Sequence, residues 1–215
     1  MVLIFLKFGF CLRLTVAFIV LIGGVVGPSA AQDLTVPPPE PFQLITPETS
    51  SDSGDVRGGP APIVSSDLDQ LPAPVRTMRE QLIKAAKSGE IEALRPLLQE
   101  GAEPTQLSLA DIDGDPIEFL KSMSGDTQGH EMLAILLDVL DLGYAHLDRG
   151  EPTEIFVWPY FVSVDLEMLT SVQRVELFRL VTATDYEEMR AFGAYIFFRV
   201  GITPDGAWRF FVAGD

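Results

Sequence analysis

From residue 75 onward, apolar residues return at steps of three and four, which is the period of a helix with one buried face. The first apolar stripe consists of Val75, Met78, Leu82, Ala85 and Ala86. Gly89 follows this stripe and suits a left-handed helix cap. A second stripe, in residues 91–98, contains Pro96, which should weaken or bend its helix, and is followed by Gly101. The pattern therefore predicts two antiparallel helices joined by a tight turn.

Strand-forming residues dominate residues 155–161, which read IFVWPYF, and Pro159 indicates the edge or the end of that strand. Two further strands are predicted in residues 194–202 and 208–214, and Asp205-Gly206 between them is a strong hairpin signal. Two short helices are predicted before this hairpin. Their candidate starting residues are Thr170 or Ser171 and then Thr184 or Asp185. The buried face of the last strand is predicted to hold Trp208, Phe210 and Val212.

Residues 82–104, LIKAAKSGEIEALRPLLQEGAEP, resemble the helical part of an ankyrin repeat, with a helix, a glycine turn, a leucine-rich second helix and a Gly-Ala-acid-Pro tail. A second copy is indicated about 39 residues downstream, against roughly 33 in ankyrin arrays. The shared spacing is that of Glu92, Leu94, Leu97 and Leu98 in one copy and Glu131, Leu133, Leu136 and Leu137 in the other. The chain lacks a full Thr-Pro-Leu-His signature, and two copies are fewer than such arrays need, so another segment must cap the stack.

The end of the chain, FFRVGITPDGAWRFFVAGD in residues 197–215, is similar to the C-terminal segment of a family of uncharacterised secreted alphaproteobacterial proteins. This resemblance implies export and brings no activity with it. Together the patterns predict an α+β fold. Residues 75–148 should form two ankyrin-like helix pairs, and residues 149–215 should form a C-terminal unit, with two helices and a small antiparallel sheet, packed on them.

Residues 1–31 have the features of a secretory signal peptide. Lys7 and Arg13 precede or flank the apolar run LTVAFIVLIGGVVG, and Ser29 and Ala31 fit the −3 and −1 positions of a cleavage site. An uncleaved N-terminal anchor is the alternative. Residues 32–74 contain VPPPEPF, SSDSG and GGPAP, and such a composition predicts a disordered linker. We therefore expect a periplasmic or secreted protein, with no stable membrane insertion once the signal peptide is removed.

The formal charge limits the classes of partner. It is −16 for the whole chain and becomes −18 when Lys7 and Arg13 leave with the signal peptide. An acidic chain repels nucleic acids and anionic lipids, so we expect no nucleic-acid partner. A protein of the cell envelope is the partner class that remains, although solubility alone would also explain the charge. The single cysteine, Cys11, lies in the signal segment, so the mature chain has no thiol or disulfide.

The stretch DIDGDPIEFLKS, residues 111–122, resembles the start of a calcium-binding loop. Such a loop needs Gly at position 6 and Glu at position 12, where this chain has Pro116 and Ser122. A helix start explains the same residues better. Asp115 is a natural N-cap, Pro116 suits the first helical position, and Glu118 stands where a capping box requires it.

Other motifs predict no catalytic residue, no cofactor and no metal ligand. His130-Glu131 begins like a zinc-protease motif, but the second histidine would fall on Ala134. His146 is the only other histidine, and the chain has no Gly-x-Ser-x-Gly motif. Zinc and acyl-transfer sites of the usual kinds are therefore not indicated.

An aromatic group provides the candidate surface for a partner or ligand. Its members are Tyr144, Trp158 and Tyr160, with Glu154 as a nearby carboxylate. Aromatic side chains beside a polar turn can line a groove for a peptide or glycan, but the same alternation would also place them in the core. The leading hypothesis is a non-enzymatic protein-interaction module of the cell envelope. The alternative is an envelope enzyme acting on glycan or peptide, which would require Glu154, Tyr160 and Asp205 to converge in one pocket.

Overall fold

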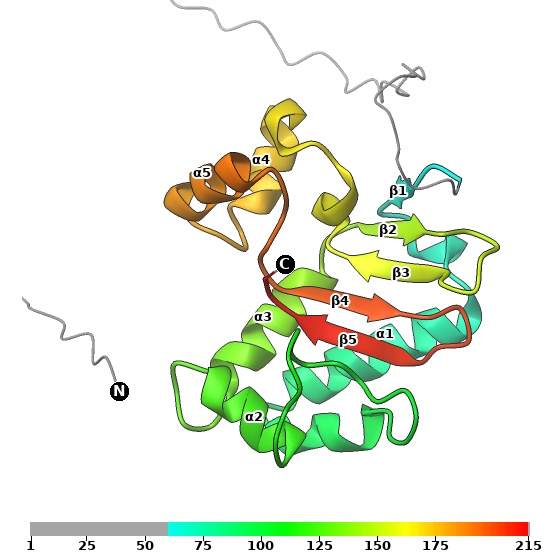
Figure 1. The fold of residues 1–215 in the computed structure, drawn as a ribbon, viewed down its shortest axis with the longest axis vertical. Helices are drawn as coiled ribbons and strands as arrows, with labels where there is room; N and C mark the ends of the chain where they lie inside the picture. The colour runs from blue at the N-terminus through cyan, green and yellow to red at the C-terminus, as the bar shows by residue number, and fades with distance from the viewer. Residues whose placement is uncertain (1–59, 215) are drawn as a thin grey trace, which may run out of the picture. The chain divides into compact units, whose positions relative to one another are not determined.

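The computed structural model describes residues 60–214, which form helices and one five-stranded antiparallel sheet in the order β1-β2-β3-β4-β5 (Figure 1). The strands are β1 (Ile63–Ser65), β2 (Tyr144–Leu147), β3 (Ile155–Trp158), β4 (Arg199–Ile202) and β5 (Trp208–Val212). The α-helices are α1 (Ala73–Lys87), α2 (Pro116–Met123), α3 (His130–Leu140), α4 (Ser171–Leu177) and α5 (Ala183–Phe192). The 3₁₀ helices are η1 (Leu68–Gln70), η2 (Ile91–Leu97), η3 (Tyr160–Ser163) and η4 (Leu166–Met168). The predicted α+β class is therefore confirmed.

The sheet is larger than predicted, and the domain boundaries move accordingly. Residues 63–65 were predicted as linker but form the edge strand β1, which pairs with β2. Residues 144–147 were assigned to the helical region but form β2, which lies between β1 and β3. Both strands are very short, so their pairing partners rather than their own residues determine that they are strands. The predicted signal peptide and residues 32–59 of the predicted linker lie outside the described residues.

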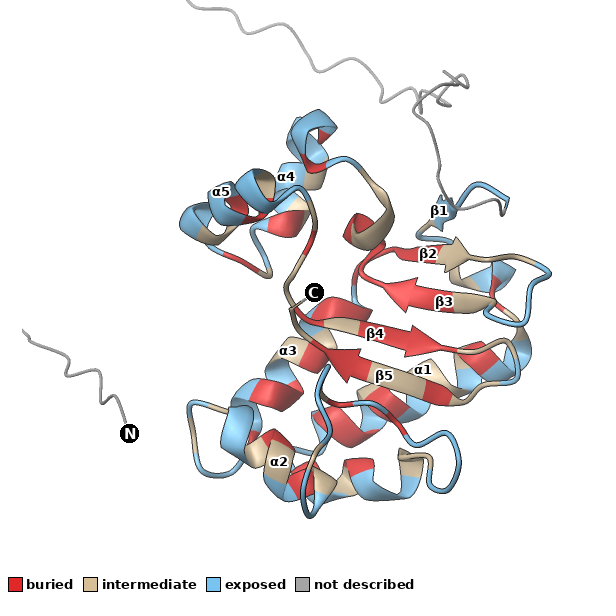
Figure 2. Cartoon of the chain, viewed as in Figure 1, coloured by how far each residue is buried: buried red, intermediate tan, exposed pale blue. Residues whose placement is uncertain are grey.

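The main core lies between one face of the sheet and the helices α1 and α3 (Figure 2). On the sheet side, large side chains form rows across neighbouring strands. One row is Trp158, Val200 and Phe211, and the next is Phe156, Ile202 and Trp208. On the helix side, Leu82, Leu136 and Val139 are fully buried. Because each row crosses three strands, the sheet and the helices bury one continuous apolar layer.

The first two helical segments lie where the two apolar stripes predicted them. Helix α1 carries the first apolar stripe, and Pro96 leaves the second helical segment, η2, as a 3₁₀ helix. Asp115 caps α2 as predicted, because its carboxylate accepts the backbone N–H groups of Ile117 and Glu118. The reciprocal half of the predicted capping box does not form, since the Glu118 carboxylate binds Lys121 at 2.7 Å instead.

The simple alternation predicted for β5 fails at Arg209. Gly201 of β4 pairs with Phe210, and the following residue, Ile202, pairs with Trp208. Arg209 therefore has no partner in β4 and forms a β-bulge. The bulge puts Trp208 and Phe211 on the helix side of the sheet. Phe210 turns to the opposite face, where its ring covers Gly201 and leaves no room for a Cβ atom there.

A second, smaller core holds the C-terminal helices together. Leu177 and Met189 from α4 and α5 pack with Phe161 of η3. Thr170 caps α4 as predicted, within a complete capping box. Helix α5 starts earlier than predicted, because its N-cap is Thr182. Asp185, which was a candidate start, is the third helical residue and completes a capping box with Thr182.

Candidate functional site

The predicted aromatic surface does not exist, because its three aromatic residues are core residues. Trp158 is fully buried, and Tyr144 and Tyr160 expose only 2% and 5% of their surface. The Tyr144 hydroxyl donates to the carbonyl of Asp67 at 3.1 Å, and the Tyr160 hydroxyl donates to Glu176 at 2.7 Å. Burial and the neighbouring Glu176 carboxylate together raise the pKa of Tyr160. These hydroxyls are therefore used to satisfy hydrogen bonds inside the fold.

Glu154 stabilises the turn between β2 and β3. Its carboxylate accepts the backbone N–H of Gly150 at 2.9 Å and lies 2.7 Å from Nε2 of His146. These two contacts lower the pKa of Glu154, the Gly150 N–H having the larger effect. The His146 ring in turn stacks on Phe156 with centroids 4.0 Å apart. The predicted partner residue Glu154 therefore has a structural role in this turn.

The three groups that an enzyme would need do not share one site, because Tyr160 lies at the opposite end of the sheet from Glu154 and Asp205. Glu154 directly precedes β3, whereas Tyr160 follows the other end of that strand. Asp205 lies in the β4–β5 turn, where its carboxylate accepts a short hydrogen bond from the hydroxyl of Thr203 and its pKa is lowered by that bond. The three groups therefore do not converge in one pocket, as the enzyme alternative would require.

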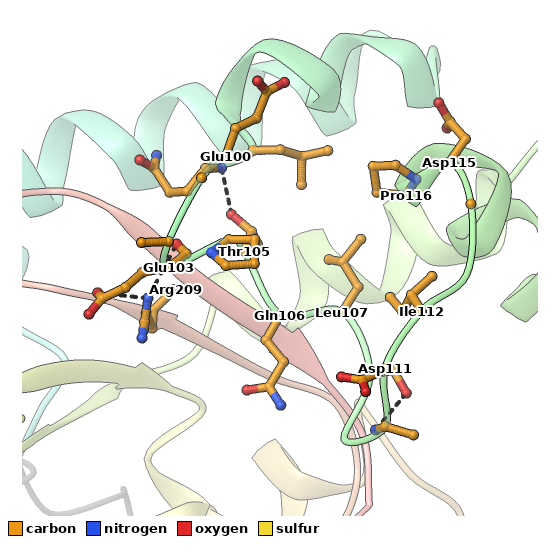
Figure 3. A pocket seen from close by; sticks show the side chains of 18 of the residues that line it. Glu100, Glu103, Thr105, Gln106, Leu107, Asp111, Ile112, Asp115, Pro116 and Arg209 are labelled. Carbon is orange, nitrogen blue, oxygen red and sulfur yellow. Dashed lines mark hydrogen bonds and ion pairs between the residues drawn. The ribbon is translucent and has the colours of Figure 1, made fainter.

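An open cavity lies beneath the connection between η2 and α2 (Figure 3). Its volume is about 1090 Å³. Almost every residue of the connecting segment, residues 98–115, lines it, and Arg95, Pro116 and Arg209 complete the wall. We call residues 98–115 the cavity loop. A connection of this length without helix or strand is unusual in a compact domain and is commonly functional.

Thr105 and Gln106 fix the cavity loop to the edge of the sheet. The Thr105 hydroxyl donates to the carbonyl of Trp208 at 2.7 Å and accepts the N–H of Gln99 at 2.8 Å. Gln106 exchanges backbone hydrogen bonds with β5, from its N–H to Arg209 at 2.9 Å and from Phe211 to its carbonyl at 2.8 Å. Thr105 is a buried polar residue, and these bonds satisfy its hydroxyl. The loop is thus anchored at its middle.

Two ion pairs hold the loop on either side of this anchor. Arg95 donates to Asp115 at 2.7 Å and to Glu92 at 2.8 Å. The Arg95 guanidinium, together with the N–H groups at the start of α2, lowers the pKa of Asp115 to about 2. Near the other end, Arg209 lies 3.0 Å from the carboxylate of Glu103. Both arginines of the cavity wall are therefore neutralised by carboxylates of the same wall or its rim.

The remaining lining of the cavity is apolar and acidic. Leu98, Leu109 and Ile112 contribute aliphatic surface, whereas Leu107 lies in the wall as a buried core residue; Figure 3 labels Leu107 and Ile112. Glu100 and Asp111 also line the cavity, and neither forms an ion pair within residues 60–214. The cavity therefore combines apolar surface with two free carboxylates and no free cation of its own.

No group of three or more His, Cys, Asp or Glu side chains in residues 60–214 is arranged to hold a metal ion. No helix in this part of the chain is both long enough and apolar enough to cross a membrane.

Sequence reasoning assigned the helix start in this region correctly, with Asp115 as the cap and Pro116 as the first helical residue. The cavity loop itself was missed as a site. The signal that could have found it is the length of the polar, Gly- and Pro-containing stretch between Leu97 and Pro116, two residues that bound neighbouring helices. The candidate surface was instead predicted from its aromatic residues, and these are buried in the core.

Comparison with known proteins adds no relative. No protein-family model matches the chain, no curated protein matches it, and no solved structure matches it. The functional argument therefore rests on the geometry of the chain's own residues.

Proposed function

We propose that this chain is an exported, non-enzymatic protein-interaction module of the cell envelope, periplasmic or secreted, whose binding site is the cavity beneath residues 98–115. The observation that carries the proposal is the open cavity of about 1090 Å³, which combines apolar and acidic lining with a loop anchored at both ends and in the middle. A preformed concave surface of this kind suits recognition of a protein segment.

The arrangement of helices is part of the proposal. The segments α1–η2 and α2–α3 act as two divergent ankyrin-like helix pairs, and the sheet takes the place of the missing further repeats by covering α1 and α3. The cavity then lies where the connection between the two pairs crosses the edge of the sheet.

Site-directed photocross-linking tests the binding site. A benzophenone amino acid at position 109, where Leu109 lines the cavity and is 49% exposed, should form a discrete adduct with an envelope protein in cells. The matched control is position 168, where Met168 is 77% exposed but does not line the cavity. Equal labelling from both positions, or no adduct from position 109, would refute the proposed site.

Export is tested separately. We expect the protein recovered from the envelope fraction to begin at Gln32, as given by N-terminal sequencing, because signal cleavage is proposed after Ala31. Recovery of an intact N-terminus from membranes would instead support the uncleaved anchor.

A further inference from the structure

We propose that the cavity takes a partner segment in which a cationic side chain stands next to an apolar one, and that Arg209 of the chain itself occupies the cation position until the partner displaces it. This inference rests on the proposed function and adds the chemistry of the partner and a means of control. It follows from the charges of the cavity, from its apolar surface and from the difference between its two arginines.

The charges of the cavity favour a cation. Glu100 and Asp111 are free of ion pairs within the described residues, whereas Arg95 and Arg209 are already paired. An anionic ligand would find no free cation and would meet two carboxylates. A lysine or arginine would instead be attracted by the carboxylate nearest to it, and the net charge of −16 would assist its approach.

The apolar surface of the cavity favours a ligand that has an apolar side chain as well as a cation. Leu98, Leu109 and Ile112 present aliphatic side chains to the same space. The long methylene stem of an arginine or lysine can cover part of this surface, and a neighbouring leucine-like side chain can cover the rest. A short peptide with both features therefore matches the cavity better than an isolated cation or an apolar peptide.

The two arginines of the wall are held very differently. Arg95 donates hydrogen bonds to two carboxylates, those of Asp115 and Glu92, and Asp115 is itself fixed as a helix cap. Arg209 has one carboxylate partner, Glu103, at 3.0 Å and one carbonyl contact with the same residue at 3.3 Å. Arg95 would therefore have to leave two carboxylates to move, whereas Arg209 forms a single ion pair that can be exchanged.

The Arg209 pair is also exposed enough to open. Its side chain is 38% exposed and that of Glu103 is 76% exposed, and exposed ion pairs of this kind contribute little to stability. The backbone of Arg209 stays fixed, because its carbonyl accepts the N–H of Gln106. Only the side chain needs to swing away, after which the Glu103 carboxylate can accept the cation of the partner in place of Arg209.

A peptide titration followed by NMR tests this inference. The probe is the acetylated and amidated peptide Gly-Leu-Arg-Leu-Gly, and the matched controls replace its arginine by glutamate or both leucines by glycine. With the full chain at low salt, the arginine peptide should shift amide signals of residues 98–112. The glutamate peptide should not bind, and the leucine-free peptide should bind about tenfold more weakly or less, since each tenfold corresponds to about 1.4 kcal/mol.

Variants of the chain separate the two parts of the inference. The double variant Glu100→Gln, Asp111→Asn should weaken binding of the arginine peptide about fivefold or more, whereas Arg209→Gln should strengthen it about threefold by freeing Glu103. The matched control is Arg190→Gln, which breaks a similarly exposed ion pair with Glu167 on another surface and should leave binding unchanged. Thermal melts confirm that each variant is folded.

Several outcomes would overturn the inference. Unchanged or weaker binding by Arg209→Gln excludes Arg209 as a competitor. Binding of the glutamate peptide, or a dimer in sedimentation velocity that the double variant abolishes, assigns the cavity to another occupant. Absence of peptide binding together with a specific adduct at position 109 refutes this partner chemistry while the proposed function stands. Absence of both refutes the proposed function itself.

Discussion

The aromatic segment around β3 and the acidic cavity loop both stand out in the sequence, and the fold uses them in opposite ways. Trp158 and Tyr160 are buried and their region is closed by packing, whereas Glu100 and Asp111 lie on an open cavity. The difference follows from burial. Large aromatic side chains gain most from leaving water, and unpaired carboxylates lose most, so the aromatic segment is buried while the carboxylates of the loop stay at the surface.

The two regions also hold their polar groups differently. Around β3, the tyrosine hydroxyls each donate one hydrogen bond within the fold. In the cavity loop, only Thr105 is a buried polar side chain, and the carboxylates stay near water. We therefore expect substitutions in the aromatic segment to change stability, and substitutions in the loop to change stability only where they touch its anchors.

The largest effect should come from Trp158→Ala. Trp158 is fully buried and packs against Tyr144 with ring centroids 5.4 Å apart, so the substitution leaves a large cavity. The free energy of unfolding should fall by about 3–5 kcal/mol in denaturant titration. The contrasting variant is Leu109→Ala on the exposed loop, for which we expect a change within about 0.5 kcal/mol. Similar losses of unfolding free energy in the two variants would contradict the view that one region is core and the other an exposed loop.

An intermediate effect is expected from Thr105→Val, which keeps the shape of the side chain and removes its hydroxyl. The N–H of Gln99 and the carbonyl of Trp208 would each lose a partner. The free energy of unfolding should fall by about 1–3 kcal/mol, and the amide hydrogens of the cavity loop should exchange faster. Thr77→Val on the exposed face of α1 is the control and should change neither quantity. If the amide hydrogens of the cavity loop exchange as slowly in Thr105→Val as in wild type, this anchor is dispensable.

Much of the fold could be predicted because its signals are local. The caps Asp115 and Thr170 and the turn at Gly206, with its φ of 91°, are set by neighbouring residues. Strands β1 and β2 could not be predicted, since segments of three and four residues become strands only by pairing, as in the register of His146 with Phe156.

The candidate site was beyond sequence reasoning for a similar reason. The path of the cavity loop depends on the hydrogen bond between Thr105 and Trp208, residues 103 positions apart. Whether an aromatic strand faces a core or a groove likewise depends on what packs on it. For Trp158 the answer comes from the neighbouring strands, with Val200 beside it in the sheet. The local sequence pattern contains neither the long-range hydrogen bond of Thr105 nor the neighbours of Trp158 in the sheet.

A smaller effect, one that disappears in acid, is expected from Asp115→Asn. The folded-state pKa of Asp115 is about 2, below its ordinary value of 3.8, so its ionised form stabilises the fold. This contribution is fully present above about pH 4 and is lost as the pH falls through about 2. Asparagine still caps α2 but cannot pair with Arg95, so the melting temperature of the variant should lie slightly below wild type at pH 5 and approach it at pH 2. A constant difference across this range would assign the effect to the cap instead of the charge.

The smallest effect should come from Glu100→Gln, and its contrast with Glu154→Gln completes the comparison of the two regions. Glu154 is engaged by His146 and Gly150, so its substitution should lower the melting temperature slightly at neutral pH. Glu100 forms no ion pair within residues 60–214, so its substitution should leave the melting temperature unchanged. A destabilised Glu100→Gln chain would mean that the cavity carboxylates are structural, and they would then not be free to receive a cation. Unchanged melting with weakened peptide binding is the combination that only a binding carboxylate produces.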